Sequence, residues 1–192
     1  MDLVPPRAGL EHEEESHEPP EPIVNCPSCG APMQLAAGED YYRCEFCRAV
    51  YAPDEDQDGV RVFGESSEFA CPVCAVPLAD AALAHRRMLY CRQCHGMLVP
   101  MGEFVELVEQ LRSRREGPGA LQTPADPRDL ERSLQCPKCR QRMDTHFYEG
   151  PGNVVIDSCS RCFLDWLDCG ELFRISRAPD RDYTGPYEIP AL

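Results

Sequence analysis

Two Cys-x-x-Cys pairs, Cys136-Pro137-Lys138-Cys139 and Cys159-Ser160-Arg161-Cys162, stand 19 residues apart and decide the fold of the segment that contains them. A Cys-x-x-Cys turn directs two sulfur atoms toward one point. Two such turns on the arms of a hairpin can therefore surround a tetrahedral Zn²⁺ with four thiolates. Soft sulfur ligands in tetrahedral geometry indicate zinc or iron. The spacing predicts a small hairpin domain that is held together by a closed metal site.

The same pair of motifs occurs three times along the chain. The two pairs of a unit are separated by 14, 16 and 19 residues, whereas 23 and 41 residues separate one unit from the next. This alternation predicts three consecutive modules, named here modules 1, 2 and 3, which together bind three Zn²⁺ ions. The predicted ligands are Cys26, Cys29, Cys44 and Cys47 in module 1; Cys71, Cys74, Cys91 and Cys94 in module 2; and Cys136, Cys139, Cys159 and Cys162 in module 3.

Modules 2 and 3 repeat one another beyond their cysteines. An offset of 68 residues aligns residues 98–104 with residues 166–172. Apolar residues with helical spacing then predict a helix from Glu103 to about Arg114. In module 3, Asp168 and Glu171 have the N-cap and N3 spacing of a capping box, which predicts a shorter helix near Asp168.

Module 3 resembles the bacterial TFIIB-type zinc ribbon, also called the transcription-factor zinc-finger domain. The likeness lies in its two cysteine pairs and in Asp165-Trp166-Leu167-Asp168-x-Gly170-Glu171-Leu172. Module 2 looks like a degenerate copy, with Leu98 for the tryptophan and Pro100 for the aspartate. Module 1 resembles zinc ribbons only in its cysteine pairs. The resemblance implies a rubredoxin-like zinc ribbon fold and no defined activity.

The expected fold class is a small metal-stabilised α+β protein of three tandem zinc ribbons, built from short β-hairpins with four-cysteine zinc sites. Domains this small usually need a metal to fold, and zinc binding would supply most of the folding free energy of each module. The modules are expected to fold independently, because the connection over 116–128 is rich in glycine and proline. The expected boundaries are a disordered acidic segment at 1–21, ribbon 1 at 22–63, ribbon 2 with its helix at 69–115, a linker at 116–130, ribbon 3 at 131–178 and a flexible tail at 179–192.

Charge and cysteine content restrict the setting of the protein. The formal net charge is −14, from 33 acidic and 19 basic residues, and most of the acid lies outside the modules. No apolar run is long enough to span a membrane, and the N-terminus has no secretory signal. A cytoplasmic location is therefore expected, where thiols stay reduced and cysteine clusters bind metal. No membrane partner is expected.

Other chemistry of the same cysteines is disfavoured. Rubredoxin-type iron would use the same four ligands. Cys91-Arg92-Gln93-Cys94-His95 matches the haem attachment motif, but that attachment occurs in exported proteins. A thioredoxin-like dithiol needs a βαβ pattern, which is missing. The thirteenth cysteine, Cys169, is interpreted as an apolar filler, with a reactive thiol at a helix N-terminus as the alternative.

The preferred function is a zinc-binding protein-interaction scaffold with an unidentified protein partner, and the resemblance adds a transcription-associated role. An enzyme is not expected, because four thiolates leave a zinc ion no open position. The alternative is a nucleic-acid-binding protein, either single-stranded or linked to RNA polymerase. Duplex DNA should bind weakly or not at all, because an acidic protein repels a polyanion. Single-stranded bases could stack on aromatic residues, with the candidates Tyr41, Tyr42, Phe147 and Trp166.

Overall fold

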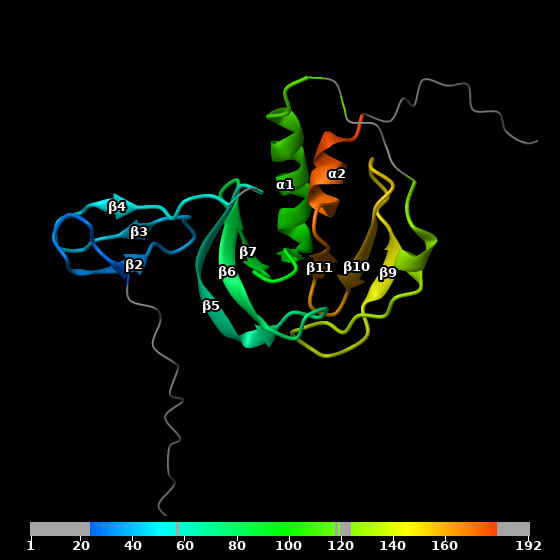
Figure 1. Cartoon of the computed structure of the whole chain (residues 1–192), viewed down its shortest axis with the longest axis horizontal. Helices are drawn as coiled ribbons and strands as arrows, with labels where there is room; N and C mark the ends of the chain where they lie inside the picture. Colours follow the sequence, from blue (N-terminus) through cyan, green and yellow to red (C-terminus); the bar gives the residue numbers. More distant parts are fainter. Residues whose placement is uncertain (1–23, 57, 118, 120–123, 180–192) are drawn as a thin grey trace, which may run out of the picture.

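The structure, a computed structural model, describes residues 24–56, 58–117, 119 and 124–179. The expected acidic segment at 1–21 and the tail from residue 180 lie outside this part of the chain. The described residues form two antiparallel sheets, one of four strands and one of seven. Figure 1 shows the smaller sheet projecting from the side of the larger one, and two helices packed together on one face of the larger sheet.

Module 1 is built on the four-stranded sheet, in the order β1-β2-β3-β4. Its core contains Met33 and Tyr42 beside the buried Cys26 and Cys44, so the metal site is a large part of what this sheet can bury. The strands are short: β1 (Val24–Asn25), β2 (Pro32–Leu35), β3 (Tyr42–Arg43) and β4 (Val50–Tyr51).

Modules 2 and 3 share the seven-stranded sheet, in the order β5-β6-β7-β8-β11-β10-β9. Module 2 contributes β5 (Val60–Ala70), β6 (Pro77–Leu83), β7 (Arg86–Tyr90), β8 (Met97–Pro100) and helix α1 (Met101–Ser113). Module 3 contributes β9 (Asp144–Phe147), β10 (Val155–Cys159), β11 (Leu164–Leu167) and helix α2 (Glu171–Arg177). The segment expected as a linker contains a short 3-10 helix, η1 (Pro127–Leu130).

The prediction that modules 2 and 3 are independent is wrong. Strand β8 pairs with β11 along its whole length, from Met97 opposite Leu167 to Pro100 opposite Leu164. These strands are apolar toward both faces of the sheet, since Leu98, Val99, Trp166 and Leu167 are at most 3% exposed. Each hairpin alone would leave this apolar edge in water, and pairing the two edges buries both.

The pairing gives the sequence repeat a structural meaning. Leu98 lies directly opposite Trp166, and these two residues also correspond to each other under the 68-residue offset. A residue that faces its own repeat equivalent marks a two-fold axis between the copies. The two modules are therefore arranged as a pseudo-symmetric dimer within one chain.

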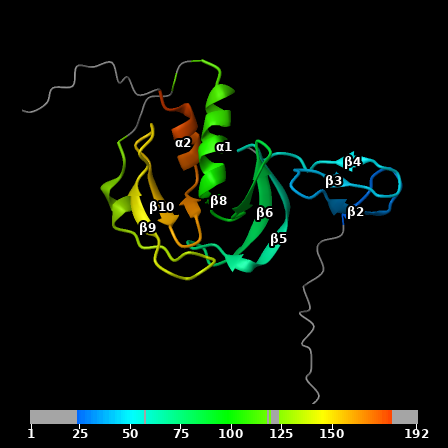
Figure 2. The same ribbon diagram turned by 180° about the vertical axis from the view of Figure 1, so that it is seen from behind.

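The shared sheet is covered on both faces. On one face, α1 and α2 pack side by side, as both views show (Figures 1 and 2), and Phe104, Leu107 and Ile175 lie in one apolar cluster with strand residues of both modules. Arg112 near the end of α1 donates a hydrogen bond of 2.8 Å to the carbonyl of Ile175 in α2. The apolar face of α1 is thus covered by strands of both modules and by α2.

On the opposite face, a second apolar cluster holds cysteines of both sites. It brings Leu98, Trp166 and Met143 together with Cys71 and Cys91 of module 2 and with Cys136 and Cys159 of module 3. The two sites therefore stabilise one continuous core and not two separate ones.

Module 1 contacts the larger sheet through its β5 edge. Residues 60–63, which the sequence placed at the end of the first ribbon, belong to β5 and pair with β6. The Phe63 side chain nevertheless packs into the module 1 core, and the Tyr42 hydroxyl donates to the Phe63 carbonyl at 2.5 Å. Asp40 forms an ion pair with Arg61 at 3.2 Å, and its carboxylate lies 3.0 Å from His85 Nδ1.

Helix α2 begins with half of the expected capping box. Glu171 Oε2 accepts a hydrogen bond of 2.7 Å from the Asp168 backbone N–H. The Asp168 carboxylate caps no N–H group; it accepts from Trp166 Nε1 at 2.9 Å and pairs with Arg132. The Asp168 carboxylate thus holds the buried Trp166 ring in place. Module 2 lacks this contact, because the corresponding residue, Pro100, has no polar side-chain atom.

Glu171 should make stability depend on pH. Burial raises the pKa of Glu171 from 4.5 to about 7, against the lowering effect of Arg132 and Arg174. Because the pKa of this carboxyl group is higher in the folded state than in the unfolded state, its protonation stabilises the folded state. This contribution is fully present below the pKa of the unfolded state, 4.5, and is lost as the pH rises through about 7. Glu171→Gln, which keeps an acceptor for the Asp168 N–H, is expected to be more stable than the native chain by about 2–3 kcal/mol at pH 8. The difference should shrink toward pH 5 in denaturant unfolding of the two zinc-loaded proteins. A difference that stays constant with pH would show that Glu171 is ionised throughout.

No helix among the described residues combines the length and the apolar character that crossing a membrane requires.

Candidate metal centres

The six Cys-x-x-Cys turns share one backbone conformation. In each turn the residue after the second cysteine has a positive φ, between 55° and 76°, and these residues are Gly30, Arg48, Ala75, His95, Arg140 and Phe163. In five of the turns that residue donates its N–H to the carbonyl of the first cysteine, as Gly30 does to Cys26 at 2.8 Å. This left-handed step curls the chain back, so that both thiols of a pair point to the same side.

The twelve predicted ligands assemble into the three predicted groups. In each group the four sulfur atoms lie within 4.8 Å of one another. The sulfur–sulfur distances that cross from one pair to the other are 3.5 Å for Cys26–Cys47, 3.6 Å for Cys29–Cys44 and for Cys71–Cys94, and 3.7 Å for Cys139–Cys159. A disulfide bond would need about 2.05 Å, whereas four sulfurs at about 2.3 Å from a zinc ion stand about 3.8 Å apart. The geometry is compatible with three Zn²⁺ ions.

Backbone N–H groups at the turns favour the thiolate, the form that binds metal, and burial of the sulfur atoms opposes it. At Cys71 burial dominates and raises the pKa of the thiol, although the N–H groups of Val73 and Cys74 point at its sulfur at 3.4 and 3.3 Å. In module 3 the hydrogen bond from the backbone N–H of Gln141 lowers the pKa of the Cys139 thiol to about 7, although burial of the thiol acts in the opposite direction.

The three sites differ in access. In every pair the first cysteine is buried and the second is more exposed, but only in module 1 are the second cysteines, Cys29 and Cys47, fully exposed. In modules 2 and 3 the corresponding sulfurs are partly covered by the shared apolar cluster. A chelator should therefore reach the module 1 ion first.

We expect three zinc ions per chain and two kinetic classes of release. A chelator with a colour change on zinc binding should remove one equivalent rapidly and two slowly. Cys29→Ser should abolish the rapid phase and leave the slow one, because module 1 has its own sheet and core. Release of all three ions at one rate would show that the sites are equally accessible.

The remaining residues singled out in the sequence lie outside these groups. Cys169 is exposed and belongs to none of the three. Asp165 is buried, which raises its pKa, and it accepts a 2.6 Å hydrogen bond from Ser158. His146 lies 3.0 Å from the Ser158 hydroxyl, so the polar residues of this face satisfy one another.

Of the four expected base-stacking residues, two are unsuitable. Tyr42 is 6% exposed and Trp166 is 0% exposed, because both fill the cores beside the cysteines. Phe147 is 50% exposed on the edge strand β9. Three further phenylalanines are exposed that the sequence did not single out: Phe46, inside the second turn of module 1, at 77%, Phe163 at 69% and Phe173 at 51%.

No protein-family model matches this chain, and neither the curated proteins nor the solved structures gave a match.

Proposed function

We propose that this chain is a zinc-stabilised protein-interaction scaffold in which module 1 carries the partner-binding surface. The observation that supports this is the exposure of three apolar side chains within residues 46–51 of module 1. Phe46, Val50 and Tyr51 are 77%, 56% and 39% exposed. Val50 and Tyr51 make up β4, which is an outer strand of the four-stranded sheet and, among the described strands, pairs only with β3.

An outer strand with apolar side chains suits a partner that adds a strand of its own. Exposed aromatic residues also supply large contact area at low entropic cost. The chain adds a strong negative charge, −14 in total, and the segment that follows module 1 carries Asp54, Glu55, Asp56 and Asp58. The partner that fits is a protein segment with apolar and basic side chains.

The cysteine groups support a structural role for the metal. Each group supplies four sulfurs, which complete the coordination of a tetrahedral zinc ion and leave no position for a substrate or a reactive water. On this proposal the ions hold the modules in shape, and the chemistry of the protein lies in its surfaces. The likeness of module 3 to TFIIB-type zinc ribbons makes a partner in transcription the first to examine.

The proposal is tested by placing a photo-crosslinking amino acid at position 46 in the zinc-loaded full chain in cells. A defined protein adduct is expected from position 46. The matched control is position 147, where an aromatic residue that is also well exposed lies on the other sheet. If Val50→Ser abolishes the adduct, the partner contacts strand β4. No protein adduct, or the same adducts from both positions, would contradict the proposal.

Single-stranded nucleic acid is the second candidate for the same surface. Arg43 and Arg48 are exposed near Phe46 and Tyr51 in the sequence of module 1, and a base could stack on an aromatic ring beside an arginine. We expect fluorescence anisotropy to show no sub-micromolar binding of duplex or single-stranded oligonucleotides at physiological salt. Tight single-strand binding that Phe46→Ala abolishes would instead establish nucleic acid as the ligand.

A further inference from the structure

We infer that Asp56, Asp58 and His95 form a fourth metal site, open to solvent, for a divalent cation of the first transition row. The ligand atoms of the three residues lie within 4.8 Å of one another. The site stands apart from the three cysteine groups in composition, because it has oxygen and nitrogen donors and no sulfur. It does not depend on the proposed scaffold function.

The loop has the sequence pattern of a cation-binding turn. Asp56-Gln57-Asp58-Gly59 places two carboxylates at alternate positions before a glycine, as the second half of the calcium-loop pattern D-x-D-x-D-G does. Asp54, which stands at the first position of that pattern, is not part of the cluster. Gly59 has φ +79°, the left-handed conformation that a sharp turn requires there. A complete calcium loop would take its last ligand from Glu65, farther along the chain. Strand β5 carries that residue away to pair with Ala79.

Among the described side chains, His95 supplies the third ligand. It lies far beyond Asp58 in the sequence, and the second cysteine turn of module 2 holds it at φ 60°. His95 Nδ1 is 3.9 Å from Asp58 Oδ2. Donor atoms at about 2.1 Å from one ion stand about 3.0–3.4 Å apart, so these two side chains need to approach by less than about 1 Å. An imidazole beside two carboxylates shifts the preference from calcium and magnesium toward manganese, iron or zinc.

Four contacts hold the donors in place. Asp56 Oδ1 accepts the N–H groups of Asp58 and Val60, both at 2.9 Å, which leaves Oδ2 facing the cluster. The Tyr90 hydroxyl lies 2.9 Å from Asp56 Oδ2 and 2.5 Å from His95 Nδ1. The hydroxyl donates to Asp56 Oδ2, whereas its contact with His95 Nδ1 depends on the tautomer of the imidazole, so a cation bound at Nδ1 leaves Tyr90 its bond to Asp56.

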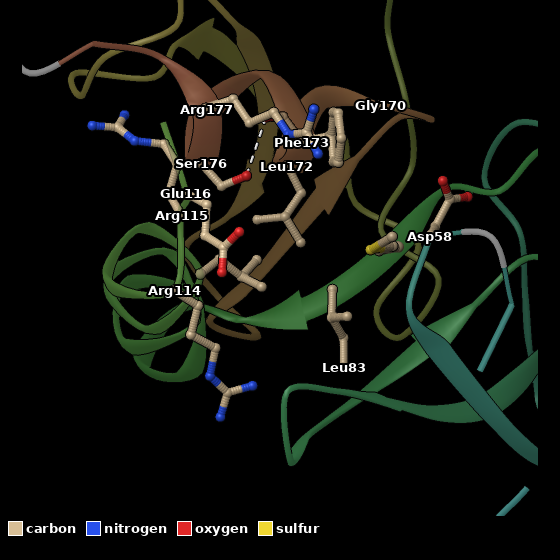
Figure 3. A pocket seen from close by; sticks show the side chains of 12 residues that line it. Asp58, Leu83, Arg114, Arg115, Glu116, Gly170, Leu172, Phe173, Ser176 and Arg177 are labelled. Atoms are coloured by element: carbon tan, nitrogen blue, oxygen red, sulfur yellow. Dashed lines mark hydrogen bonds between the residues drawn. The ribbon is translucent and has the colours of Figure 1, made fainter. Parts of the chain in front are cut away.

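The site has room for water or a small ligand on the ion. The side chains of Asp58 and His95 are 39% and 38% exposed. Asp58 also lines a cavity of about 480 Å³ between the ends of α1 and α2. In Figure 3 it lies at one end of this cavity, away from Arg114 and Arg115. Three protein ligands, two of them reached by solvent, leave coordination positions for water, as in exchangeable and catalytic metal sites.

The test uses Mn²⁺ and the zinc-loaded full chain. Mn²⁺ prefers oxygen and nitrogen donors and stands lowest in the affinity series, so it does not displace zinc from thiolates. Electron paramagnetic resonance measures the loss of the free Mn²⁺ signal. We expect one ion per chain, with affinity at least tenfold weaker in Asp58→Asn and in His95→Asn, since asparagine tolerates a positive φ.

Asp54→Asn is the matched control, because it removes the same charge from the same loop at an exposed residue outside the cluster. It should change the affinity less than threefold. In NMR spectra of the native chain, Mn²⁺ should broaden the ring protons of His95 and spare those of His146. The inference is overturned if no Mn²⁺ binds below about 1 mM, if Asp54→Asn weakens binding as much as Asp58→Asn, or if both histidines broaden alike.

Discussion

We expect Cys136→Ser to unfold modules 2 and 3 together and to leave module 1 folded. The lost ligand opens the site in module 3, where zinc binding contributes roughly 10–16 kcal/mol by analogy with finger peptides. Cys136 lies in the same apolar cluster as Cys71 and Cys91 of module 2, and β11 is paired with β8. A loss of this size exceeds what a small domain can absorb.

Amide hydrogen exchange of the zinc-loaded protein measures the effect residue by residue. Protection should disappear from β6, β7 and β8 as well as from module 3, whereas β2 and β3 of module 1 should keep theirs. The control is Cys169→Ser, since Cys169 is exposed and belongs to no cysteine group. Persistent protection of β6 and β7 would show that module 2 folds alone.

Trp166→Ala is expected to cost about 3–5 kcal/mol, the range for emptying a buried tryptophan site. Trp166 is fully buried opposite Leu98, on the pseudo-two-fold axis. Its indole N–H is bonded to Asp168, so the change also leaves that carboxylate without one of its donors. Denaturant unfolding followed by circular dichroism gives the free energy. Phe147→Ala, which truncates a half-exposed aromatic residue on β9, should cost below about 1 kcal/mol.

A second change tests the same contact from the other module. A Cβ at Gly96 would lie 2.2 Å from Cζ2 of Trp166, so Gly96→Ala should be strongly destabilising in the native chain. In a Trp166→Leu background the obstructing ring is gone, and the same substitution should cost less. Equal costs in both backgrounds would mean that Gly96 is required for a reason other than this contact.

The cysteine groups could be predicted in full because their geometry is local. Four residues of a Cys-x-x-Cys turn and one left-handed residue bring two sulfurs together, and a hairpin of 14 to 19 residues brings two turns together. The helix at the C-terminal end of module 2 could also be predicted, because the spacing of its apolar residues is a local signal as well. It was expected from Glu103 and runs over Met101–Ser113; the two extra residues continue directly from β8.

The three cysteine groups, the pairing of their ligands and the repeat between modules 2 and 3 can all be read from residue spacing. That the two repeats form one sheet follows only from their contacts in three dimensions. In the folded chain two apolar strand edges lie against each other and bury one another: Leu98-Val99 in β8 and Trp166-Leu167 in β11. The tertiary structure also decided that His95 lies beside Asp56 and Asp58 of the acidic loop. Both outcomes depend on contacts between residues far apart in the chain, for which local spacing carries no signal.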